Sequence, residues 1–542
     1  MGKSTVILNV EVSQKQNHIS RKSFLTTLLW AGALLPFLQY CQQQTKSMLL
    51  KITGTNHILG HRLWAKNFPK PTEKIQTKFL IVGGGISGLS ACRYFTKNNE
   101  NDFLLVEMEN HLGGNASNGE NRFSKFPLGA HYLPIPNKED AELIDFLKES
   151  GIYLGDDLGG LPVFDEEQLS FPKQERLFFR NQWQNDLIPQ NGISAETKAE
   201  IDRFFKMMDD YRVRKDGLGK YWFDIPITKS SVESQDLDKI TFEKWLHQNG
   251  FNSTELLWIL DYSCKDDYGL GVKYVSAWAG IHYFAGRKNN WAPNKHDQVF
   301  TWPEGNARLA KHLSKFVEGK NLSQHLVYDV IWNAQNVEVL VFDNQSQISK
   351  KITAEKVIFA TPQFVNQHIF KGREWRNFHY SPWLLATLTL RNQFGGGDEL
   401  AWDNVIFGAE GLGYINDQHQ NLNQNTGEKV ITYYRSFSTA DSKMARKRLY
   451  YMKDEALKKL VLDDLRLAHP EIEAHIIEIQ FHKLGHGMIS PVPDFIFGSE
   501  IQLAKEPIDD KIFFAHTDLS GISIFEEAFH QGIRAAKQMT GR

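Results

Sequence analysis

Cysteine is scarce in this chain, and its scarcity excludes two kinds of site. Only three of the 542 residues are cysteines, namely Cys41, Cys92 and Cys264. They are too few and too far apart for a disulfide framework or a cysteine-based metal site, so we expect no bound metal. Cys92 falls in a predicted helix, where we expect a small buried side chain.

The chain also lacks an excess of charge of either sign. It has 62 Lys and Arg residues against 64 Asp and Glu residues, which gives a formal net charge of −2. This balance argues against a nucleic-acid-binding protein, because such a protein carries a basic surface. With 41% hydrophobic and 12% aromatic residues the composition is not that of a disordered protein, and the length requires two or more domains.

No apolar run is long enough to cross a membrane comfortably. The run from Phe24 to Leu38 follows the basic pair Arg21 and Lys22, which is typical of an export signal over residues 1–41. Residues 20–25, Ser-Arg-Lys-Ser-Phe-Leu, resemble the twin-arginine signal with Lys in place of the second Arg. That resemblance implies export of a protein that is already folded around its cofactor.

Residues 38–41, Leu-Gln-Tyr-Cys, also resemble a lipoprotein box in which Cys41 would carry the lipid, although Tyr40 is bulky where a small residue is usual. These patterns predict a periplasmic or membrane-associated protein, with membrane attachment through the N-terminus. The alternative is a cytoplasmic protein whose first segment is an amphipathic or anchoring one.

A glycine-rich stretch stands where a predicted strand passes into a predicted helix. Phe79 to Val82 has the length and β-branched content of a buried parallel strand, and residues 83–88, GGGISG, follow it directly. Apolar residues recur at helical spacing from Ile86 to Phe95, and a second strand from Phe103 to Val106 ends in Glu107. This is the G-x-G-x-x-G pattern of a dinucleotide-binding turn in its expected context.

Each residue type in this turn has a mechanical reason. Gly83 permits the tight turn, Gly85 lets the backbone approach a pyrophosphate, and Gly88 lets the helix pack on the strand. The helix N-terminus offers free N–H groups and a partial positive charge to phosphate. A carboxylate at Glu107 can accept hydrogen bonds from an adenosine ribose. The stretch therefore predicts a dinucleotide site.

The residues after Glu107 distinguish NAD from FAD. Residues 108–118 read MENHLGGNASN, and the pair Gly113 and Gly114 resembles the second signature of a large flavoprotein superfamily that includes amine oxidases, protoporphyrinogen oxidases and phytoene desaturases. The resemblance implies bound FAD, with the Gly pair close to its diphosphate and ribityl chain. This chain departs from the family in having Asn115 where Arg is usual.

Segments in the middle of the chain are similar to the same superfamily. Residues 126–132, FPLGAHY, resemble the segment whose Gly-Ala backbone lies against the flavin, with the last two side chains beside the ring. Residues 301–306, TWPEGN, resemble the segment that returns the chain to the cofactor domain. Val330 takes the position of a backbone contact to adenine, and residues 356–362 resemble the buried strand that a proline ends.

The C-terminal part carries a further match. Residues 513–518, FFAHTD, resemble the family's Phe-Ala-Gly-Thr-Glu, whose acid binds a ribityl hydroxyl, and this role falls to Asp518. The helix that starts near Ser523 would direct its N–H groups at the flavin, with Phe525 as the backbone donor. Ile524 stands where amine oxidases have an aromatic residue of the cage around the amine, which implies a substrate unlike that of a monoamine oxidase. The last quarter has no Cys, so we expect FAD to be bound non-covalently.

Together these patterns predict an α/β fold, with a Rossmann-like FAD-binding domain assembled from discontinuous segments and an α+β substrate domain. The expected parts are an export signal (1–41), a linker or wrap (42–77), three FAD-binding segments (78–137, 301–365 and 491–542) and two substrate-domain segments (138–300, mostly helical, and 366–490). Strands are expected at 324–331, 337–342, 381–391, 429–434 and 476–482, and a helix at 453–468. The predicted cofactor-binding residues are Gly83, Gly85, Ile86, Ser87, Gly88, Glu107, Met108, Gly113, Gly114, Asn115, Gly129, Ala130, His131, Val330, Ala360, Asp518 and Phe525.

The resemblance implies an oxidoreductase in which FAD takes a hydride from a C–N or C–C bond of an amine or an apolar small molecule. The catalytic residue stays open, with His131, Tyr268 and His486 as candidates. Tyr268 is expected between two helices and near the pocket. No second G-x-G-x-x-G occurs, so NADPH is not expected as electron partner, and the acceptor stays open between oxygen and a quinone. The alternatives on this scaffold are a redox-neutral isomerase or mutase and a non-enzymatic carrier.

Overall fold

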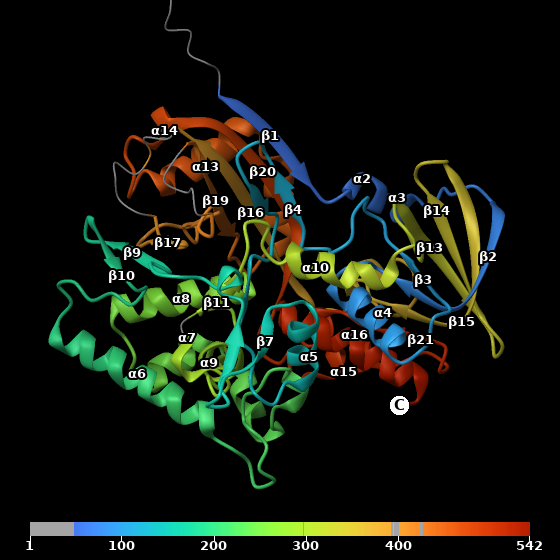
Figure 1. The fold of residues 1–542 in the computed structure, drawn as a ribbon, viewed down its shortest axis with the longest axis horizontal. Coiled ribbons are helices and arrows are strands. Elements are labelled where there is room, and N and C mark those ends of the chain that lie inside the picture. Colours follow the sequence, from blue (N-terminus) through green and yellow to red (C-terminus); the bar gives the residue numbers. More distant parts are fainter. Residues whose placement is uncertain (1–47, 296–297, 392–393, 395–399, 422–426) are drawn as a thin grey trace, which may run out of the picture. The chain divides into compact units, whose positions relative to one another are not determined.

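The computed structural model describes residues 48–295, 298–391, 394, 400–421 and 427–542. The predicted export signal therefore lies outside the described residues. From Leu49 onward the chain forms one compact unit, built on two large sheets (Figure 1). Within these ranges, no helix combines the length and the apolar character needed to cross a membrane.

The first sheet is the Rossmann-like one and has the order β12-β3-β2-β15-β14-β13. β2, β3, β12 and the C-terminal half of β15 run parallel to their neighbours, and β21 continues this parallel part along the end of β15. β13, β14 and β15 form an antiparallel meander. The strands of the first sheet are β2 (Pro71–Val82), β3 (Phe103–Val106), β12 (Asn321–Leu322), β13 (His325–Trp332), β14 (Val337–Asp343), β15 (Ile348–Phe359) and β21 (Ile512–Phe514).

Both faces of this sheet are covered, which explains the unbroken apolar run at the end of β2. Phe79 and Ile81 belong to a core under α4 (Ile86–Lys97), α10 (Ala307–Ser314) and α16 (Phe525–Thr540). Leu80 and Val82 belong to a second core with the antiparallel strands. Because β2, β15 and β21 come from distant parts of the sequence, the Rossmann-like part is assembled from discontinuous segments.

The second sheet has the order β1-β20-β16-β19-β18-β17-β9-β10 and lies to the left of the first in Figure 1. β16 pairs antiparallel with β19 and β20, while β1 adds a parallel edge strand to β20. Its strands are β1 (Leu49–Gly54), β9 (Glu175–Phe179), β10 (Gln182–Asn185), β16 (His379–Leu390), β17 (Asp403–Ile406), β18 (Tyr414–Asn416), β19 (Lys429–Ser436) and β20 (Ile476–Ser490).

Helices cover the two faces of the second sheet differently. On one face, Trp383 and Leu385 of β16 share an aromatic-rich core with α6 (Ala195–Val213), α7 (Phe242–Gln248), α8 (Thr254–Tyr268) and α9 (Ala277–Ala285). On the other face lie α12 (Ser442–Tyr451) and α13 (Asp454–Leu465), where the Tyr433 hydroxyl donates to Asp464. The helical face is the one that the site described below uses.

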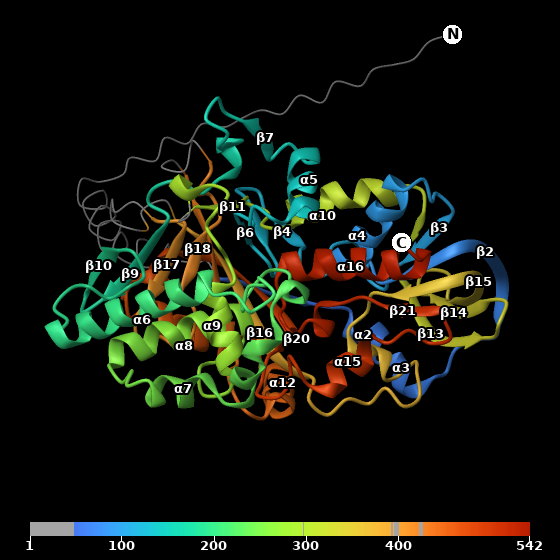
Figure 2. The ribbon, with the colours of Figure 1, turned by 90° about the horizontal axis from the view of Figure 1, so that it is seen from below.

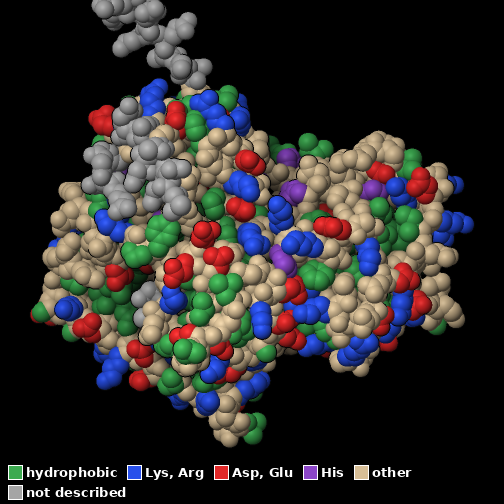
Figure 3. Space-filling model, viewed as in Figure 1, with side chains coloured by type: hydrophobic (Ala, Val, Ile, Leu, Met, Phe, Trp, Pro, Cys, Tyr) green, Lys and Arg blue, Asp and Glu red, His purple; other side chains and the backbone are tan. Residues whose placement is uncertain are grey.

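Short elements complete the described parts. They are α2 (His57–Gly60), α3 (Arg62–Ala65), β4 (Asn118–Glu120), β5 (Lys125–Pro127), β6 (Tyr132–Pro134), α5 (Ala141–Glu149), β7 (Tyr153–Asp156), β8 (Pro162–Phe164), β11 (Val299–Thr301), α11 (Gln363–Asn366), α14 (Ile472–His475) and α15 (Ser499–Lys505). On the face shown in Figure 3, acidic and basic side chains are interspersed, as the balanced composition suggests.

The strands expected from periodicity are found, and two local expectations are wrong. In the segment 42–77, expected as a linker or wrap, the described residues from Leu49 on form β1, α2, α3 and the first half of β2. The segment from 138 to 286 is not mostly helical throughout, because the hairpins β7–β8 and β9–β10 precede its long helices. Residues 266–268 form the last turn of α8 rather than a loop, and Gly269 ends that helix with a φ of +69°.

Candidate functional site

The glycine turn joins β2 to α4 as the motif predicts. Gly83 has a φ of +105°, and a Cβ on it would stand 2.6 Å from the Ala360 carbonyl oxygen. A Cβ on Gly88 would stand 1.9 Å from the Gly83 carbonyl oxygen, so the helix packs here directly on the turn. Gly85 is different, since no atom lies within 4 Å of where its Cβ would be. Only at Gly85 does this turn leave room for a ligand.

Ile86 and Ser87 begin α4 and are buried. The Ser87 hydroxyl donates to the Ala528 carbonyl oxygen at 2.8 Å, and so it joins α4 to α16. The side chain of Ser87 is therefore used in packing, and only its backbone N–H remains to serve the dinucleotide site. The helix N-terminus keeps the partial positive charge that favours phosphate.

Glu107 lies at the end of β3, beside the glycine turn. Its Oε2 accepts from Gly84 N at 2.6 Å and its Oε1 accepts from Glu109 N at 2.7 Å. Burial raises the pKa of this carboxyl, and the two backbone donors oppose that shift. Met108, next along the chain, packs with Leu59 of the N-terminal segment. The carboxylate thus holds the turn and stands where the motif places a ribose acceptor.

The Gly pair lies against the first glycine turn. Gly113 N donates to the Gly84 carbonyl oxygen at 2.8 Å, and a Cβ on Gly114 would approach Gly85 Cα to 3.3 Å. Asn115, which replaces the family's Arg, donates from Nδ2 to the Gly487 carbonyl oxygen at 2.8 Å. Asn115 is an uncharged link between the Rossmann-like part and β20, and not a cation for the diphosphate.

A cavity opens between these segments and the second sheet, with a volume of about 130 Å³. Its lining combines predicted cofactor-binding residues, among them Phe525, the first residue of α16, with residues of α8, β16, β19 and β20. The wall residues used below are Asn115, Gly129, Ala130, His131, Tyr132, Asp266, Asp267, Arg287, Asn306, Tyr434, Ile524, Phe525 and Glu526.

The lining of this cavity is also acidic. Asp266 Oδ2 accepts from the Tyr132 hydroxyl at 3.3 Å, and Arg287 donates to Glu526 at 2.8 Å. Burial, together with the neighbouring charge of Asp267, raises the pKa of Asp266 to about 7. Burial raises the pKa of Asp267 to about 6, and Arg287 opposes this shift. Among the lining residues one guanidinium thus faces three carboxyl groups.

Four polar atoms of the residues that line this cavity have no hydrogen-bond partner among the described residues, namely Arg287 Nε, Trp383 Nε1, the Tyr434 hydroxyl and Asn306 Oδ1. Of the two that can accept a hydrogen bond, Tyr434 is only 5% exposed and Asn306 only 1%. Buried polar atoms without partners are rare and costly, and at a cavity they indicate where a ligand would bond. Asn306 is held in place because its Nδ2 donates to the Tyr132 carbonyl oxygen at 2.8 Å.

His131, a candidate for catalysis, lies in the cavity wall. Its ring centroid is 4.6 Å from that of Tyr434 and 5.0 Å from that of Tyr132. Burial lowers the pKa of His131 to about 4, so the imidazole is neutral near pH 7. The sequence predicted that His131 and Tyr132 lie side by side near the ring, but it did not predict that Tyr434 joins them.

The other two catalytic candidates lie outside the lining of the cavity. Tyr268 is fully buried, and its hydroxyl donates to the Ala279 carbonyl oxygen at 2.8 Å. Its neighbours Asp266 and Asp267 on α8 line the cavity, but the Tyr268 side chain points into the helical core. His486 stacks on Phe364 with centroids 3.9 Å apart, while Gly487 and Met488 of the same strand do line the cavity.

The remaining predicted contacts lie at the Rossmann-like sheet. Ala360 N donates to the Val82 carbonyl oxygen at 2.7 Å, which places it beside the glycine turn, and Val330 is buried in β13. Asp518 is 1% exposed, and its Oδ2 accepts from the Tyr380 hydroxyl at 2.6 Å and from Gln363 N at 2.7 Å. Protein groups thus already surround this carboxylate, and its role at a ribityl chain stays a prediction.

Sequence reasoning missed Asp266, Asp267, Asn306 and Tyr434 as site residues. A signal was present for the two acids, because they directly precede Tyr268, which was itself expected near the pocket. Charged pairs on an amphipathic helix usually face water, whereas this pair faces a cavity. No local signal distinguishes Asn306 or Tyr434, since their roles depend on packing between distant segments.

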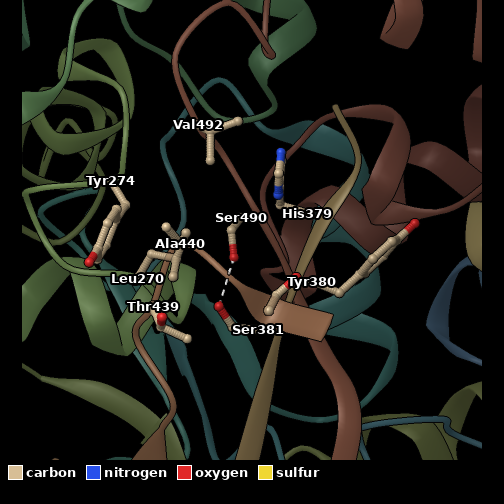
Figure 4. A pocket seen from close by; sticks show the side chains of 10 residues that line it. Leu270, Tyr274, His379, Tyr380, Ser381, Thr439, Ala440, Ser490 and Val492 are labelled. Atoms are coloured by element: carbon tan, nitrogen blue, oxygen red, sulfur yellow. Dashed lines mark hydrogen bonds between the residues drawn. The ribbon is translucent and has the colours of Figure 1, made fainter. Parts of the chain in front are cut away.

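A second hollow lies beside β16 and β20 and is shown in Figure 4. The hydroxyls of Ser381 and Ser490 are 3.0 Å apart there, and Ser490 Oγ donates to the Tyr268 carbonyl oxygen at 2.7 Å. The Tyr380 side chain points away from the hollow, toward Asp518. These hydroxyls are satisfied by protein, so this hollow offers less for a ligand than the acidic cavity does.

Comparisons with known proteins support the Rossmann-like fold. The family model of an NAD(P)-binding Rossmann-like domain matches residues 81–150. The sequence matches no curated protein. The structure is similar to that of wild-type putrescine oxidase bound to putrescine, with 15% identity over 86% of this chain and 100% of that one and a TM-score of 0.60.

Two other similar structures are those of enzymes whose names give different activities. Cyclohexylamine oxidase from Brevibacterium oxydans IH-35A is 14% identical, over 86% of this chain and 99% of that one, with a TM-score of 0.60. A CLA-producing fatty acid isomerase from P. acnes is 14% identical, over 84% of this chain and 97% of that one, with a TM-score of 0.58. At these identities the likeness shows the fold alone: a mixed α/β chain with a Rossmann-like domain and a second, substrate-type domain.

Proposed function

We propose that this chain is an FAD-dependent oxidoreductase that oxidises an amine at the carbon next to the nitrogen. The observation that carries this proposal is that Asp266 and Asp267 line the same cavity as the flavin-signature residues Gly129 and Ala130. The shared fold with putrescine oxidase and cyclohexylamine oxidase supports it. Of the two substrate kinds implied by the sequence, an amine fits this acidic lining better than an apolar molecule does.

The residues present fit FAD. The open space at Gly85 and the close approach of Gly114 make a glycine cradle for a diphosphate, and Glu107 is positioned for the ribose. The backbone of Gly129 and Ala130 and the N-terminus of α16 at Phe525 would hold the ring end, since all three line the cavity. When bound, FAD would supply the hydride-accepting chemistry.

The protein's own part begins with recognition of a cation. If all groups are ionised, Asp266, Asp267 and Glu526 outweigh Arg287 by two negative charges. A buried carboxylate gains more from an ammonium partner than an exposed one does, because the surrounding dielectric is low. The unpartnered Tyr434 hydroxyl and Asn306 Oδ1 provide further sites for the donors of an ammonium group.

The second part is proton handling. An ammonium has no free electron pair at nitrogen, so it must lose a proton before its neighbouring C–H bond can give up a hydride. Asp266, with a pKa of about 7, is suited to take that proton near neutral pH. His131 is neutral under the same conditions and can accept a hydrogen bond. The acceptor of the electrons stays a choice between oxygen and a quinone.

The test is anaerobic bleaching of the purified yellow protein by a matched substrate panel. The panel contains a monoamine, a diamine, and the neutral alcohol and alkene of the same chain length. The proposal expects bleaching by one or both amines and none by the neutral compounds. Bleaching by the neutral compounds alone, or a moved double bond without net consumption of reductant, would contradict amine oxidation and favour the desaturase or isomerase alternative.

A further inference from the structure

α12 has an unusual distribution of charge for an exposed helix. From Lys443 to Lys453 the chain has five basic residues and no acidic one. The nearest acids flank this stretch, with Asp441 capping the N-terminus of α12 through Met444 N and Asp454 opening α13. The helix buries only Ala445 and Leu449, against β16 and β20. Arg446 is half-buried and donates to the Tyr380 carbonyl oxygen at 3.0 Å, whereas Lys443, Lys447 and Arg448 are exposed to solvent.

Large apolar side chains are exposed on the same helix. Met444 is 63% exposed, Tyr450 52% and Tyr451 68%. Isolated exposed apolar residues are ordinary, but here three lie among Lys443, Lys447 and Arg448 within ten residues of chain. No ion pair of those three cations is found within the described ranges, so their charges are not used within the fold.

The N-terminal segment extends this surface. The His57 ring of α2 lies edge-on to Tyr450 of α12, with centroids 5.2 Å apart. Ile58 of α2 is 76% exposed and Trp64 of α3 is 65% exposed. α12, α2 and α3 all lie in the lower half of the view in Figure 2. We call the surface made by these three helices the basic apolar face.

We propose that the basic apolar face binds the surface of a membrane that contains anionic phospholipid. Basic residues with interleaved Tyr, Trp and aliphatic side chains are what an interfacial segment presents, since the cations meet the headgroups and the apolar groups enter the acyl boundary. A nucleic acid would pair with the cations but would leave Ile58 and Met444 in water.

The sequence outside the described residues supports this partner. The apolar run that ends at Leu38 is joined to β1 by ten residues, which span at most about 36 Å when extended. β1 pairs with β20, and α12 covers β20. An anchor formed by that run and the basic apolar face can therefore reach one membrane, and the face would orient the body on it.

This face is separate from the candidate active site. The cavity uses Trp383 and Leu484 on one side of the second sheet, whereas α12 covers β16 and β20 from the other side. Changes on α12 should therefore leave cofactor content and substrate bleaching unaltered. The proposal stands or falls independently of the substrate.

The experiment measures partition of the full-length flavin-containing protein onto sedimented vesicles, either of phosphatidylcholine alone or of phosphatidylcholine with phosphatidylglycerol. The test variant is Lys443→Gln/Lys447→Gln/Arg448→Gln. The matched control is Lys198→Gln/Lys206→Gln/Lys311→Gln, which removes three exposed cations from α6 and α10. Both keep residues 1–47, so any contribution of the N-terminal run is the same in each.

The test variant should bind the anionic vesicles roughly 100-fold more weakly than the unchanged protein, at about five-fold for each cation removed. The control should bind as the unchanged protein does, and neutral vesicles should not distinguish the three. A second variant, Met444→Ser/Tyr451→Ser, should weaken binding to anionic vesicles without changing its salt dependence. Equal binding of test and control variants to anionic vesicles would overturn the proposal, as would binding that needs a membrane protein.

Discussion

Asp266→Asn should lower recognition of an amine and raise the stability of the protein at the same time. Asn keeps the size and an oxygen acceptor for the Tyr132 hydroxyl, but it cannot carry the negative charge. A hydrogen bond to a charged group contributes about 1.5 to 3 kcal/mol, so the amine concentration for half-maximal bleaching should rise about ten- to a hundredfold. The neutral members of the panel should be unaffected.

The stability effect follows from the raised pKa of Asp266. The ordinary pKa is 3.8 and the folded-state value is about 7, so between these pH values the folded state holds a proton that the unfolded state has lost. The folded state therefore loses stability as pH rises from about 4 to about 7, and the loss is complete above that. The rise of the pKa from 3.8 to about 7 sets an upper limit of about 4 kcal/mol on the free energy of unfolding that is lost.

The assay compares denaturant unfolding of the unchanged protein and of Asp266→Asn at pH 4 and pH 8, without substrate. From pH 4 to pH 8 the free energy of unfolding of the variant should increase relative to that of the unchanged protein, by at most about 4 kcal/mol. Asp202→Asn, on the exposed surface of α6, is the control and should show no such gain. Equal pH dependence of all three proteins, or amine bleaching that survives Asp266→Asn undiminished, would refute the reasoning.

Three further predictions concern the cofactor and the N-terminus. Gly85→Val should fold normally but lose FAD, because the new side chain would fill open space, whereas Gly88→Ala should destabilise the fold through a backbone clash. Visible absorbance and thermal unfolding distinguish these two effects, and a yellow Gly85→Val protein would disprove the glycine cradle. Glu107→Ala should weaken FAD binding about ten-fold or more, as measured by titration of the stripped protein, and unchanged affinity would remove Glu107 from the ribose site. Arg21→Gln/Lys22→Gln should retain the flavin-loaded protein in the cytoplasm if export follows the twin-arginine route, and fractionation that finds unprocessed unchanged protein there would refute export.

The part of the site that could be predicted from sequence is the part built from neighbours in the chain. Strand, glycines, helix and Glu107 lie within one short stretch, and each is selected by a local demand such as a positive φ at Gly83 or contact without a Cβ at Gly88. The start of α4 at Ile86 and the end of β15 before Pro362 follow from the same kind of local rule.

The substrate end could not be predicted in this way. Asp266, Asn306 and Tyr434 come from α8, the start of α10 and β19, and only tertiary packing brings them to one cavity. Even neighbours differ, because Tyr268 and Asp267 are adjacent on α8 but face a helical core and a cavity respectively. Which of them faces the ligand depends on the rotation of the helix, and a short acidic stretch does not fix that rotation.

The edge strand β1 has a consequence for the order in which the chain is completed. Leu49 pairs with Glu478, so the first described strand finds its partner only after nearly all of the protein has been synthesised. The same segment then contacts the Rossmann-like part, where Asn56 N donates to Glu109 at 2.7 Å. Closing so long a loop costs conformational entropy, so we expect β1 to pair late, after β20 has joined the second sheet. The edge of that sheet at β20 is therefore open until the last step of its assembly.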